Sequence, residues 1–342
     1  MAFLFKMNTS LSIIVPVYNR PDEIRELLES LKVQDFNSAF EVVIIEDGST
    51  ESSEEIVEKF RDGLQISYYF KENSGPGDSR NYGMQKAKGN YFIILDSDCI
   101  LPKQYLTEVN KELQKEFVHC FGGPDAADKS FTTVQKAINY VMTSFFTTGG
   151  IRGGEKSIGK FQPRSFNMGI SKEAFEKAGG FGRIHPGEDP DLTFRIWKAG
   201  FDSRLFPKAF VYHKRRIDWN KFYIQVNKFG SVRPILNKWH PGTAKVTYWF
   251  PSFFTLGLLA SIVIAFFGIL LPLAIYLIYF VILFMDAFIK NKSFVVAFLS
   301  IFAALTQFTG YGMGFLKSTI LLNFSNKDAE SLFPKLFFKR RQ

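Results

Sequence analysis

Two carboxylates, Asp96 and Asp98, follow directly after the apolar run Tyr91–Leu95. Such a run predicts a buried strand, and carboxylates at its end are suited to a hard divalent cation such as Mg²⁺ or Mn²⁺. The ion would bridge the oxygens of a diphosphate. Acidic residues at strand ends also cap helices or remain solvated, so this pair alone leaves both interpretations open.

A second acidic cluster places Glu188, Asp189 and Asp191 around Pro190. Crowded carboxylates raise one another's pKa, which is how a general base is tuned upward. The alternative is an acidic first turn of a helix, where negative charge is favoured by the helix dipole. The spacing of the residues does not decide between the two.

Three further side chains could contact a phosphate-bearing ligand or its metal. Asp47 could accept an N–H from a nucleotide base, or it could be an ordinary turn residue. Arg80 could clamp a diphosphate, or it could face solvent from a helix. His213 stands beside a run of cations, which favours the neutral form that binds metals, although a surface histidine is the simpler reading.

The elements that would position these residues alternate between apolar runs and helical patterns, which predicts an α/β fold with a mostly parallel sheet. The predicted strands are Leu11–Val17, Glu41–Ile45, Ile66–Phe70 and Tyr91–Leu95. Ligands bind beyond the carboxyl ends of parallel strands, and Asn19, Asp47 and Asp96 all follow such ends. Asn19 is also expected to be the N-cap of the next helix.

The C-terminal part of the chain is strongly apolar, and Val246 to Met285 contains no charged residue. A stretch of this length can cross a bilayer. We expect a domain over 1–240, membrane helices within 241–325 (253–271, 273–289 and 293–316), and a basic tail over 326–342. Three crossings are preferred. Two crossings with an interfacial or re-entrant third segment would keep the basic tail on the side of the basic loop 290–292.

The formal charge of +9 is concentrated just before the apolar region, because 213–245 holds eight Lys or Arg and one acid. This placement favours anionic headgroups and a domain that faces the cytoplasm. No nucleic-acid-binding module is visible, so nucleic acid is not an expected partner. The two cysteines do not form a disulfide framework.

Residues 11 to about 215 resemble a family 2 glycosyltransferase of the Rossmann-like GT-A fold. The resemblance is carried, in order, by Pro16-Val17-Tyr18-Asn19, Glu46-Asp47-Gly48-Ser49, Ser79-Arg80-Asn81, Asp96-Ser97-Asp98, Gly179-Gly180-Phe181, Glu188-Asp189 and Val211-Tyr212-His213. It implies a nucleotide-diphosphate sugar donor, expected to be a UDP-sugar, together with a divalent ion and inversion at the anomeric carbon.

The resemblance also implies roles for single residues. Asp98 and His213 would be metal ligands, and Asp189 the general base, with Glu188 beside it. The donor-binding residues would be Pro16, Tyr18, Asn19, Asp47, Arg80 and Asp96. The acceptor-side residues would be Asn167, Gly180 and Asp191. The apolar C-terminus resembles members that act on membrane lipid, polyprenyl-phosphate-linked or nascent-glycan acceptors.

Three other functions share parts of this pattern. A processive polysaccharide synthase would carry an Arg-Trp signature, which the region 225–229 lacks. A catalytically silent nucleotide-sugar binder or membrane scaffold would be expected to lack the metal or base residues. A nucleotidyltransferase would usually need a glycine-rich, basic loop after the first strand, which Asn19-Arg20-Pro21 does not supply.

Overall fold

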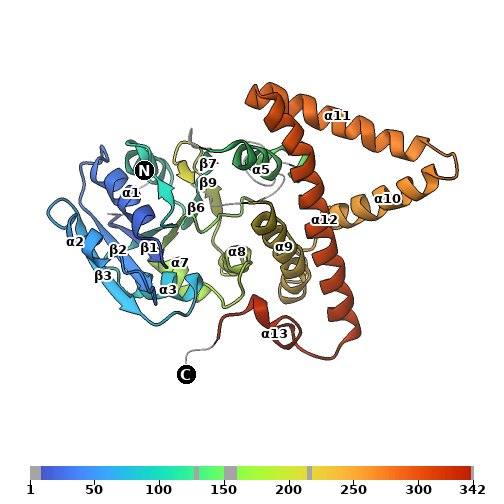
Figure 1. The fold of residues 1–342 in the computed structure, drawn as a ribbon. Coiled ribbons are helices and arrows are strands. Elements are labelled where there is room, and N and C mark those ends of the chain that lie inside the picture. Colours follow the sequence, from blue (N-terminus) through green and yellow to red (C-terminus); the bar gives the residue numbers. More distant parts are fainter. Residues whose placement is uncertain (1–8, 127–130, 150–159, 214–217, 340–342) are drawn as a thin grey trace, which may run out of the picture. The chain divides into compact units, whose positions relative to one another are not determined.

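The computed structural model describes residues 9–126, 131–149, 160–213 and 218–339 (Figure 1). The chain forms two compact units. The sheet unit comprises Met1–Asp128, Gly159–Lys214 and Phe338–Gln342, and the helical unit comprises Lys129–Ile158 and Arg215–Phe337. Each unit is thus assembled from separate parts of the chain, and the division at about residue 240 stays a prediction.

The sheet unit is built on a seven-stranded sheet in the order β3-β2-β1-β4-β8-β6-β9. Its strands are β1 (Leu11–Val17), β2 (Phe40–Asp47), β3 (Gln65–Lys71), β4 (Tyr91–Leu95), β6 (Cys120–Gly122), β8 (Asn167–Ser171) and β9 (Ser203–Leu205). β1 pairs in parallel with β2 and β4, whereas β8 is antiparallel to β4 and β6. The predicted α/β fold with a mostly parallel sheet is confirmed.

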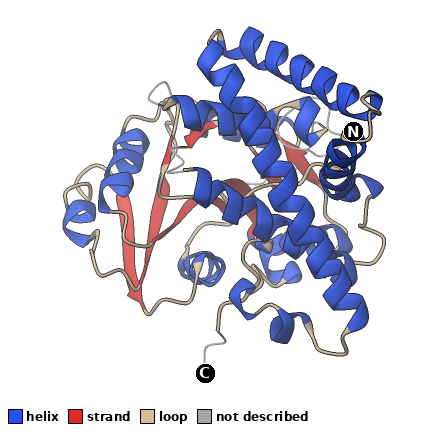
Figure 2. Cartoon of the chain, turned by 45° about the vertical axis from the view of Figure 1, so that its right-hand side comes forward, coloured by secondary structure: helices blue, strands red, loops and turns tan. Residues whose placement is uncertain are grey.

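Helices cover both faces of this sheet, and Figure 2 shows the red strands between them. The helices are α1 (Pro21–Lys32), α2 (Glu54–Glu58), α3 (Pro76–Lys86), α4 (Tyr105–Lys115), α7 (Lys172–Ala178) and α8 (Glu188–Lys198). Ile13 and Val15 of β1 pack with α1 and α4, while Ile14 packs with α3, α7 and α8. Because both faces are covered, the strands read as continuous apolar runs.

The turn between β1 and α1 differs from the expected one. α1 begins at Pro21, but its N-cap is Arg20, so the prediction of Asn19 as N-cap is wrong. Asn19 has a positive φ of 51°, which asparagine tolerates better than most residues. Its Oδ1 accepts hydrogen bonds from the N–H groups of Thr50 at 2.8 Å and Glu51 at 3.1 Å. It therefore joins the loops that follow β1 and β2.

A second, three-stranded sheet in the sheet unit has the order β5-β10-β7. β5 (Cys99–Ile100) is antiparallel to β10 (Val211–His213), and β7 (Asp125–Ala126) is parallel to it. The register pairs His213 with Cys99. This small sheet therefore brings a residue from late in the unit next to Asp98.

The helical unit holds α5 (Thr133–Thr143), α6 (Phe145–Thr148), α9 (Trp219–Trp239), α10 (Phe250–Ala265), α11 (Leu271–Asn291), α12 (Phe294–Phe324) and α13 (Ala329–Leu332), with short 3₁₀ turns at Val246–Trp249 and Pro334–Leu336. Three stretches of the described residues are long and apolar enough to cross a membrane: Val246–Ala265, Leu271–Asn291 and Phe294–Phe324. The first ends earlier than predicted, because Gly268 has a positive φ of 82° and Pro272 stands in the first turn of α11.

Part of the predicted basic segment can be placed. α9 carries Lys221, Lys228, Arg233 and Lys238, and Lys245 is the N-cap of the 3₁₀ turn that precedes α10. Lys214, Arg215 and Arg216 lie outside the described residues, as do Arg340 and Arg341 of the predicted basic tail.

Candidate active site

Asp98 and His213 lie together at the carboxyl end of the sheet. Asp98 Oδ1 is 3.0 Å from His213 Nε2, and the second oxygen, Oδ2, accepts a hydrogen bond from Arg20 Nη1 at 2.5 Å. The His213 ring stacks on Phe166 with ring centroids 5.0 Å apart. Burial raises the pKa of Asp98, but His213 and Arg20 outweigh it and lower that pKa to about 2. The carboxylate is therefore ionised.

The pair has the geometry of two neighbouring ligands of a divalent cation. Adjacent ligands on an octahedral ion, each about 2.1 Å from it, are about 3 Å apart. Among the described residues, His213 Nδ1 is buried with no hydrogen-bond partner, and the buried Asp98 Oδ1 has no contact of this kind except the one with His213 Nε2. Cys99 lies within reach, but its Sγ donates to the Phe166 carbonyl at 3.4 Å. Hard cations prefer oxygen and nitrogen ligands to sulfur, so the residues present fit a hard ion held by Asp98 and His213.

Arg80 of α3 links the end of β4 to the beginning of α8. Its Nη2 donates to Asp96 Oδ1 at 2.8 Å, its Nη1 donates to Glu188 Oε1 at 3.4 Å, and its guanidinium lies over the Phe181 ring. Burial lowers the pKa of Arg80, but Asp96, Glu188 and Asp189 raise it above the usual value. Arg80 is thus a permanent cation that fixes two acidic motifs relative to one another.

Glu188 and Asp189 form the first turn of α8, and their pKa values move in opposite directions. For Glu188, burial raises the pKa, but the His185 Nδ1 at 2.9 Å and the Arg80 cation lower it overall. For Asp189, burial and the neighbouring Glu188 raise the pKa more than Arg80 and Arg164 lower it. Asp189 Oδ1 is buried with no hydrogen-bond partner among the described residues. An ionised carboxylate beside a more basic one is the pattern of a tuned general base.

Asp47 is buried at the end of β2 and is already surrounded by donors. The Lys71 ammonium forms an ion pair with it, and the backbone N–H groups of Ser74 and Gly75 donate to its two oxygens at 3.0 Å each. These contacts hold the loop that leads into α3. A contact between Asp47 and a nucleotide base stays a prediction.

The other predicted donor-side residues lie at the end of β1. Pro16 is partly buried within that strand, and Tyr18 follows it with 51 % of its surface exposed. With Asn19 and Asp96 they line the carboxyl edge of β1 and β4, where a parallel sheet binds ligands. Their contacts with a donor stay a prediction.

Position 180 requires a glycine for structural reasons that are independent of its predicted acceptor-side role. Its φ is +70°, and a Cβ there would lie 2.4 Å from Asn81 Oδ1. That oxygen accepts a hydrogen bond from the Phe181 N–H at 2.7 Å, and Asn81 Nδ2 donates to the Phe181 carbonyl at 2.9 Å. A larger residue at 180 would displace the Asn81 side chain that fixes Phe181.

The two other predicted acceptor-side residues also make internal contacts. Asn167 is fully buried, donates to the Ala209 carbonyl at 2.8 Å and accepts from the Tyr105 hydroxyl at 2.6 Å. Asp191 accepts from Arg195 Nη2 at 2.7 Å, within α8. These contacts stabilise the sheet unit, and a role for either residue toward an acceptor stays a prediction.

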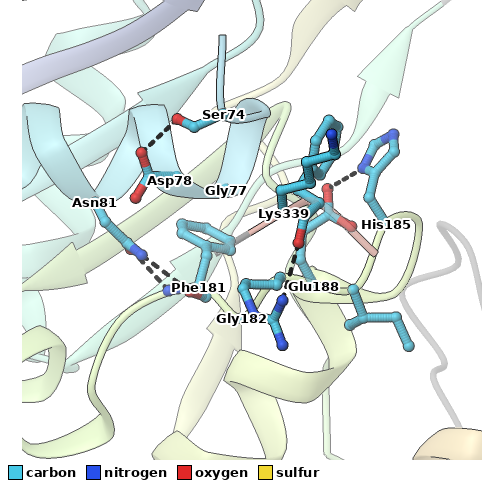
Figure 3. Close-up of a pocket in the computed structure, with 12 residues that line it drawn as sticks. Ser74, Gly77, Asp78, Asn81, Phe181, Gly182, His185, Glu188 and Lys339 are labelled. Carbon is cyan, nitrogen blue, oxygen red and sulfur yellow. Dashed lines mark hydrogen bonds and ion pairs between the residues drawn. The ribbon is translucent and has the colours of Figure 1, made fainter. Parts of the chain in front are cut away.

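A small pocket of about 70 Å³ adjoins Glu188 (Figure 3). Residues from 74–81, from 181–188 and from the C-terminal segment 338–339 line it. Figure 3 shows His185 directed at Glu188 on one side, with Asn81 and Phe181 on the other. The pocket thus borders the carboxylate whose neighbour is the candidate base.

The C-terminal segment contributes to the site, which the sequence did not suggest. The Phe338 N–H donates to the Arg183 carbonyl at 3.1 Å, and Arg183 Nη1 donates to the Phe338 carbonyl at 3.0 Å. The Phe338 ring packs on the bare backbone of Gly75, where a Cβ would lie 2.4 Å from it. In the sequence, the run of Phe and basic residues near the C-terminus is the feature that could have indicated this contact.

Three further side chains hold predicted site residues in place. Arg20 holds Asp98, Lys71 holds Asp47, and His185 holds Glu188. Arg20 could have been suspected, since it is a cation directly after the end of a strand. For Lys71 and His185 the sequence alone gives no signal.

Comparison with known protein families identifies the family to which this site corresponds. Residues 12–179 match the family model described as "Glycosyl transferase family 2". Residues 12–179 form a glycosyltransferase family 2 domain. The matched region holds the candidate residues up to Asn167, and Glu188, Asp189 and His213 follow it in the same unit.

Relatives of this chain match it over part of its length. The poly(ribitol-phosphate) β-N-acetylglucosaminyltransferase TarS of Staphylococcus aureus is 41 % identical over 100 residues, which is 28 % of this chain and 18 % of TarS. An uncharacterized glycosyltransferase of Rickettsia felis is 37 % identical over 111 residues, 32 % of this chain and 17 % of that protein. The uncharacterized glycosyltransferase YibD of Escherichia coli is 32 % identical over 115 residues, 33 % of each chain. This chain therefore matches a third or less of the length of these relatives.

Solved structures confirm the fold. The crystal structure of residues 1–349 of S. aureus TarS superposes with a TM-score of 0.50 at 19 % identity, covering 93 % of both chains. The mannosyltransferase PcManGT of Pyrobaculum calidifontis, solved with GDP-Man and Mn²⁺, superposes with a TM-score of 0.53 at 16 % identity, covering 93 % of this chain and 88 % of that one. The GT-A fold expected from the motifs is thus observed.

Proposed function

We propose that this chain is an inverting glycosyltransferase that moves a sugar from a nucleotide-diphosphate sugar to a lipid-linked or nascent-glycan acceptor at a membrane. The observation that carries the proposal is the Asp98–His213 pair, with oxygen and nitrogen 3.0 Å apart, in the same unit as a carboxylate of raised pKa, Asp189. A UDP-sugar is the expected donor.

Asp98 and His213 are the residues that would hold Mn²⁺ or Mg²⁺. When bound, the ion would neutralise charge on the leaving diphosphate. The Mn²⁺ in the mannosyltransferase complex supports a cation of this class. Arg20 keeps Asp98 ionised and oriented, and Arg80 fixes Asp96 next to the acidic turn of α8.

Asp189 is the proposed general base. As the acceptor hydroxyl attacks the anomeric carbon, its proton passes to the Asp189 carboxylate, and the bond from the anomeric carbon to the diphosphate oxygen breaks with the electron pair leaving on the diphosphate. This single displacement inverts the configuration. Glu188 stays ionised because His185 and Arg80 contact it, and its negative charge makes Asp189 more basic.

Apart from Arg80, which fixes Asp96 next to Glu188, the predicted donor-binding residues form two groups. Pro16, Tyr18 and Asp96 line the strand ends and could touch the nucleotide or its ribose. Asn19 and Asp47 use their side chains on neighbouring loops, so we propose that they position the donor site through those loops. Substituting Tyr18 should then change donor affinity without changing stability, whereas substituting Asp47 should change both.

The proposed location is a membrane, with the sheet unit facing the cytoplasm. The apolar helices support membrane association, and the cations of α9 would lie near anionic headgroups, where a polyprenyl-phosphate-linked acceptor is also found. Neutralising Lys214, Arg215, Arg216 and Lys221 should lower activity on a lipid-linked acceptor, and more so in anionic than in neutral liposomes. An equal loss on a soluble acceptor would refute this docking role.

The direct test is a donor screen on the detergent-solubilised protein, in which release of nucleotide diphosphate is followed with and without Mn²⁺. The anomeric configuration of the product, read by NMR, tests inversion. Binding without turnover across donors and acceptors would favour a silent nucleotide-sugar binder. Pyrophosphate release from a nucleoside triphosphate and a sugar phosphate would favour a nucleotidyltransferase.

A further inference from the structure

The way the helical unit meets the bilayer can be derived from its internal contacts. We propose that the α10–α11 hairpin enters a single leaflet and returns, and that α12 does not cross. The sheet unit and the end of α12 then lie on the same side of the membrane. The proposal rests on membrane association and does not depend on glycosyl transfer.

The first observation is that α5 and α6 are tied to the side of the sheet unit. They lie in the segment Lys129–Ile158, which leaves the sheet unit and returns to it. α5 has 11 residues, so it is about 16 Å long. A hydrocarbon core is about 30 Å thick, and the segment would have to cross it twice. α5 and α6 therefore stay on the side of the sheet unit.

The C-terminal half of α11 is held by these two helices. The Tyr140 hydroxyl of α5 donates to Asp286 Oδ2 at 2.6 Å, and the Tyr279 hydroxyl of α11 donates to the Phe146 carbonyl of α6 at 3.0 Å. Residues from about 279 to the end of α11 therefore lie near the side of the sheet unit, and only 271–278 remain for deep insertion.

The second half of α12 packs against α9, a helix whose charged residues keep it out of the hydrocarbon core of the bilayer. Asn227 Nδ2 donates to the Gly310 carbonyl at 3.0 Å, and a Cβ at Gly230 or Gly314 would lie 2.1 or 2.2 Å from a backbone oxygen of the facing helix. The facing helix, α9, carries Lys221, Lys228, Arg233 and Lys238. Charged side chains are costly in the bilayer core, so α9 and this half of α12 lie outside it.

The rest of α12 is too short to span. Residues 294–309 would extend about 24 Å as a helix, less than the roughly 30 Å of a hydrocarbon core. Gln307 Nε2 also lies 3.4 Å from the Thr147 carbonyl of α6. α12 is therefore anchored at several points to segments on the side of the sheet unit.

The chain beyond α12 gives an independent constraint. α12 ends at Phe324, and Phe338 exchanges two hydrogen bonds with Arg183 of the sheet unit. The chain therefore leaves and re-enters the same side of the membrane, and the number of crossings between α9 and Phe338 is even. Three crossings are excluded, which leaves two crossings or none.

The tip of the hairpin decides between these two possibilities. Figure 1 shows α10 and α11 joined at a turn, where Phe266 and Phe267 are 86 % and 80 % exposed. A turn that emerged into water on the far side would be expected to be polar. α10 is held at its base by the Ser252 hydroxyl, which donates to the Gly312 carbonyl at 3.1 Å. Residues 253–265 then extend about 20 Å, which is closer to one leaflet than to a full core.

The charges agree with this placement, because they gather at the base of the hairpin. No charged residue occurs between Lys245 and Asp286. Asp286 pairs with Lys290 at 2.9 Å near the end of α11, and Lys292 follows. A hairpin with an apolar tip and with charges only at its base is suited to insertion into the acyl region of one leaflet.

Cysteine labelling from each side of the membrane tests the proposal on the full chain. The native Cys99 and Cys120 are both buried, so the unmodified protein is the blank. Lys177→Cys, at an exposed position of α7, reports the side of the sheet unit. Lys327→Cys reports the chain after α12, and Ile269→Cys reports the hairpin tip. An impermeant maleimide is added to inside-out and right-side-out vesicles, with detergent-solubilised samples as the labelling control.

We expect 177 and 327 to label in the same vesicle orientation, and 269 to label only after detergent is added. Labelling of 327 in the opposite orientation to 177 would mean an odd number of crossings. Labelling of 269 in the orientation opposite to 177 would mean that the hairpin spans. Release of the unmodified protein by alkaline carbonate would show that the hairpin is not inserted. Each of these three results would overturn the proposal.

Discussion

Arg80 Nη1 lies 3.4 Å from Glu188 Oε1, although the two residues are 108 positions apart in the chain. Both side chains are buried, with 4 % and 6 % of their surface exposed, and Arg80 also holds Asp96. A contact of this kind makes the acidic turn of α8 depend on α3. It also means that one substitution should affect both acidic motifs.

We therefore expect Arg80→Ala to destabilise the protein by about 3–5 kcal/mol, because the buried Glu188 carboxylate and the partly exposed Asp96 carboxylate lose their shared cation. Arg80→Lys should restore only part of this loss, since an ammonium cannot present the same fork of donors. Thermal unfolding in detergent measures the effect, with exposed Arg25→Ala on α1 as the matched control. An unfolding midpoint for Arg80→Ala equal to that of the control would refute the bridging role.

Asp98→Asn should nearly abolish turnover and remove the Mn²⁺ dependence of donor binding, because an amide is a much weaker ligand for a hard cation. Calorimetry with UDP, with and without Mn²⁺, measures this directly. Asp62→Asn, an exposed substitution, is the matched control. If Mn²⁺ still strengthens UDP binding to Asp98→Asn as it does in the unmodified protein, Asp98 is not a ligand.

Asp189→Asn should keep donor binding and lose glycosyl transfer by about 10²- to 10⁴-fold, the usual contribution of a general base. Asp191→Asn is the informative comparison, because it breaks the pair with Arg195 and should lower stability more than chemistry. Nucleotide affinity and initial rates are measured on both variants. If transfer survives in Asp189→Asn but is lost in Asp191→Asn, the assignment of the general base to Asp189 is wrong.

The pH profile should reflect the raised pKa of Asp189. A base works only when deprotonated, so kcat should fall as the pH drops through a value above the usual aspartate range. In Glu188→Gln one cause of the raised pKa is gone, so this acidic limb should move to lower pH. Exposed Glu173→Gln on α7 is the control. An acidic limb that stays in place or moves to higher pH in Glu188→Gln would contradict the assignment.

The sequence was most informative where one physical cause dominated. β1 and β4 have the predicted bounds, because strands buried on both faces are unbroken apolar runs. Asn19 was misjudged because asparagine suits both an N-cap and a left-handed turn, and only the distant Thr50 and Glu51 decide between them. Local preference alone could not choose.

The residues that contact the predicted site residues could not be predicted from the sequence, for a related reason. That Asp98 lies beside His213 depends on a short antiparallel pairing between β5 and β10, which no local pattern specifies. In the sequence, Lys71 and His185 cannot be told from ordinary surface residues. Their contacts with Asp47 and Glu188 form only in the folded chain. The motif order pointed to the site, and tertiary contacts define it.

The origin of α5 between β7 and β8 has a consequence for anyone who wishes to study the sheet unit alone. Ile138 and Val141 of α5 are buried in one cluster with Leu283 and Phe308 of α11 and α12. A gene truncated at codon 240 would remove that cover and leave the apolar side of α5 bare in water. A soluble fragment would require a second edit, the replacement of 129–158 by a short polar linker.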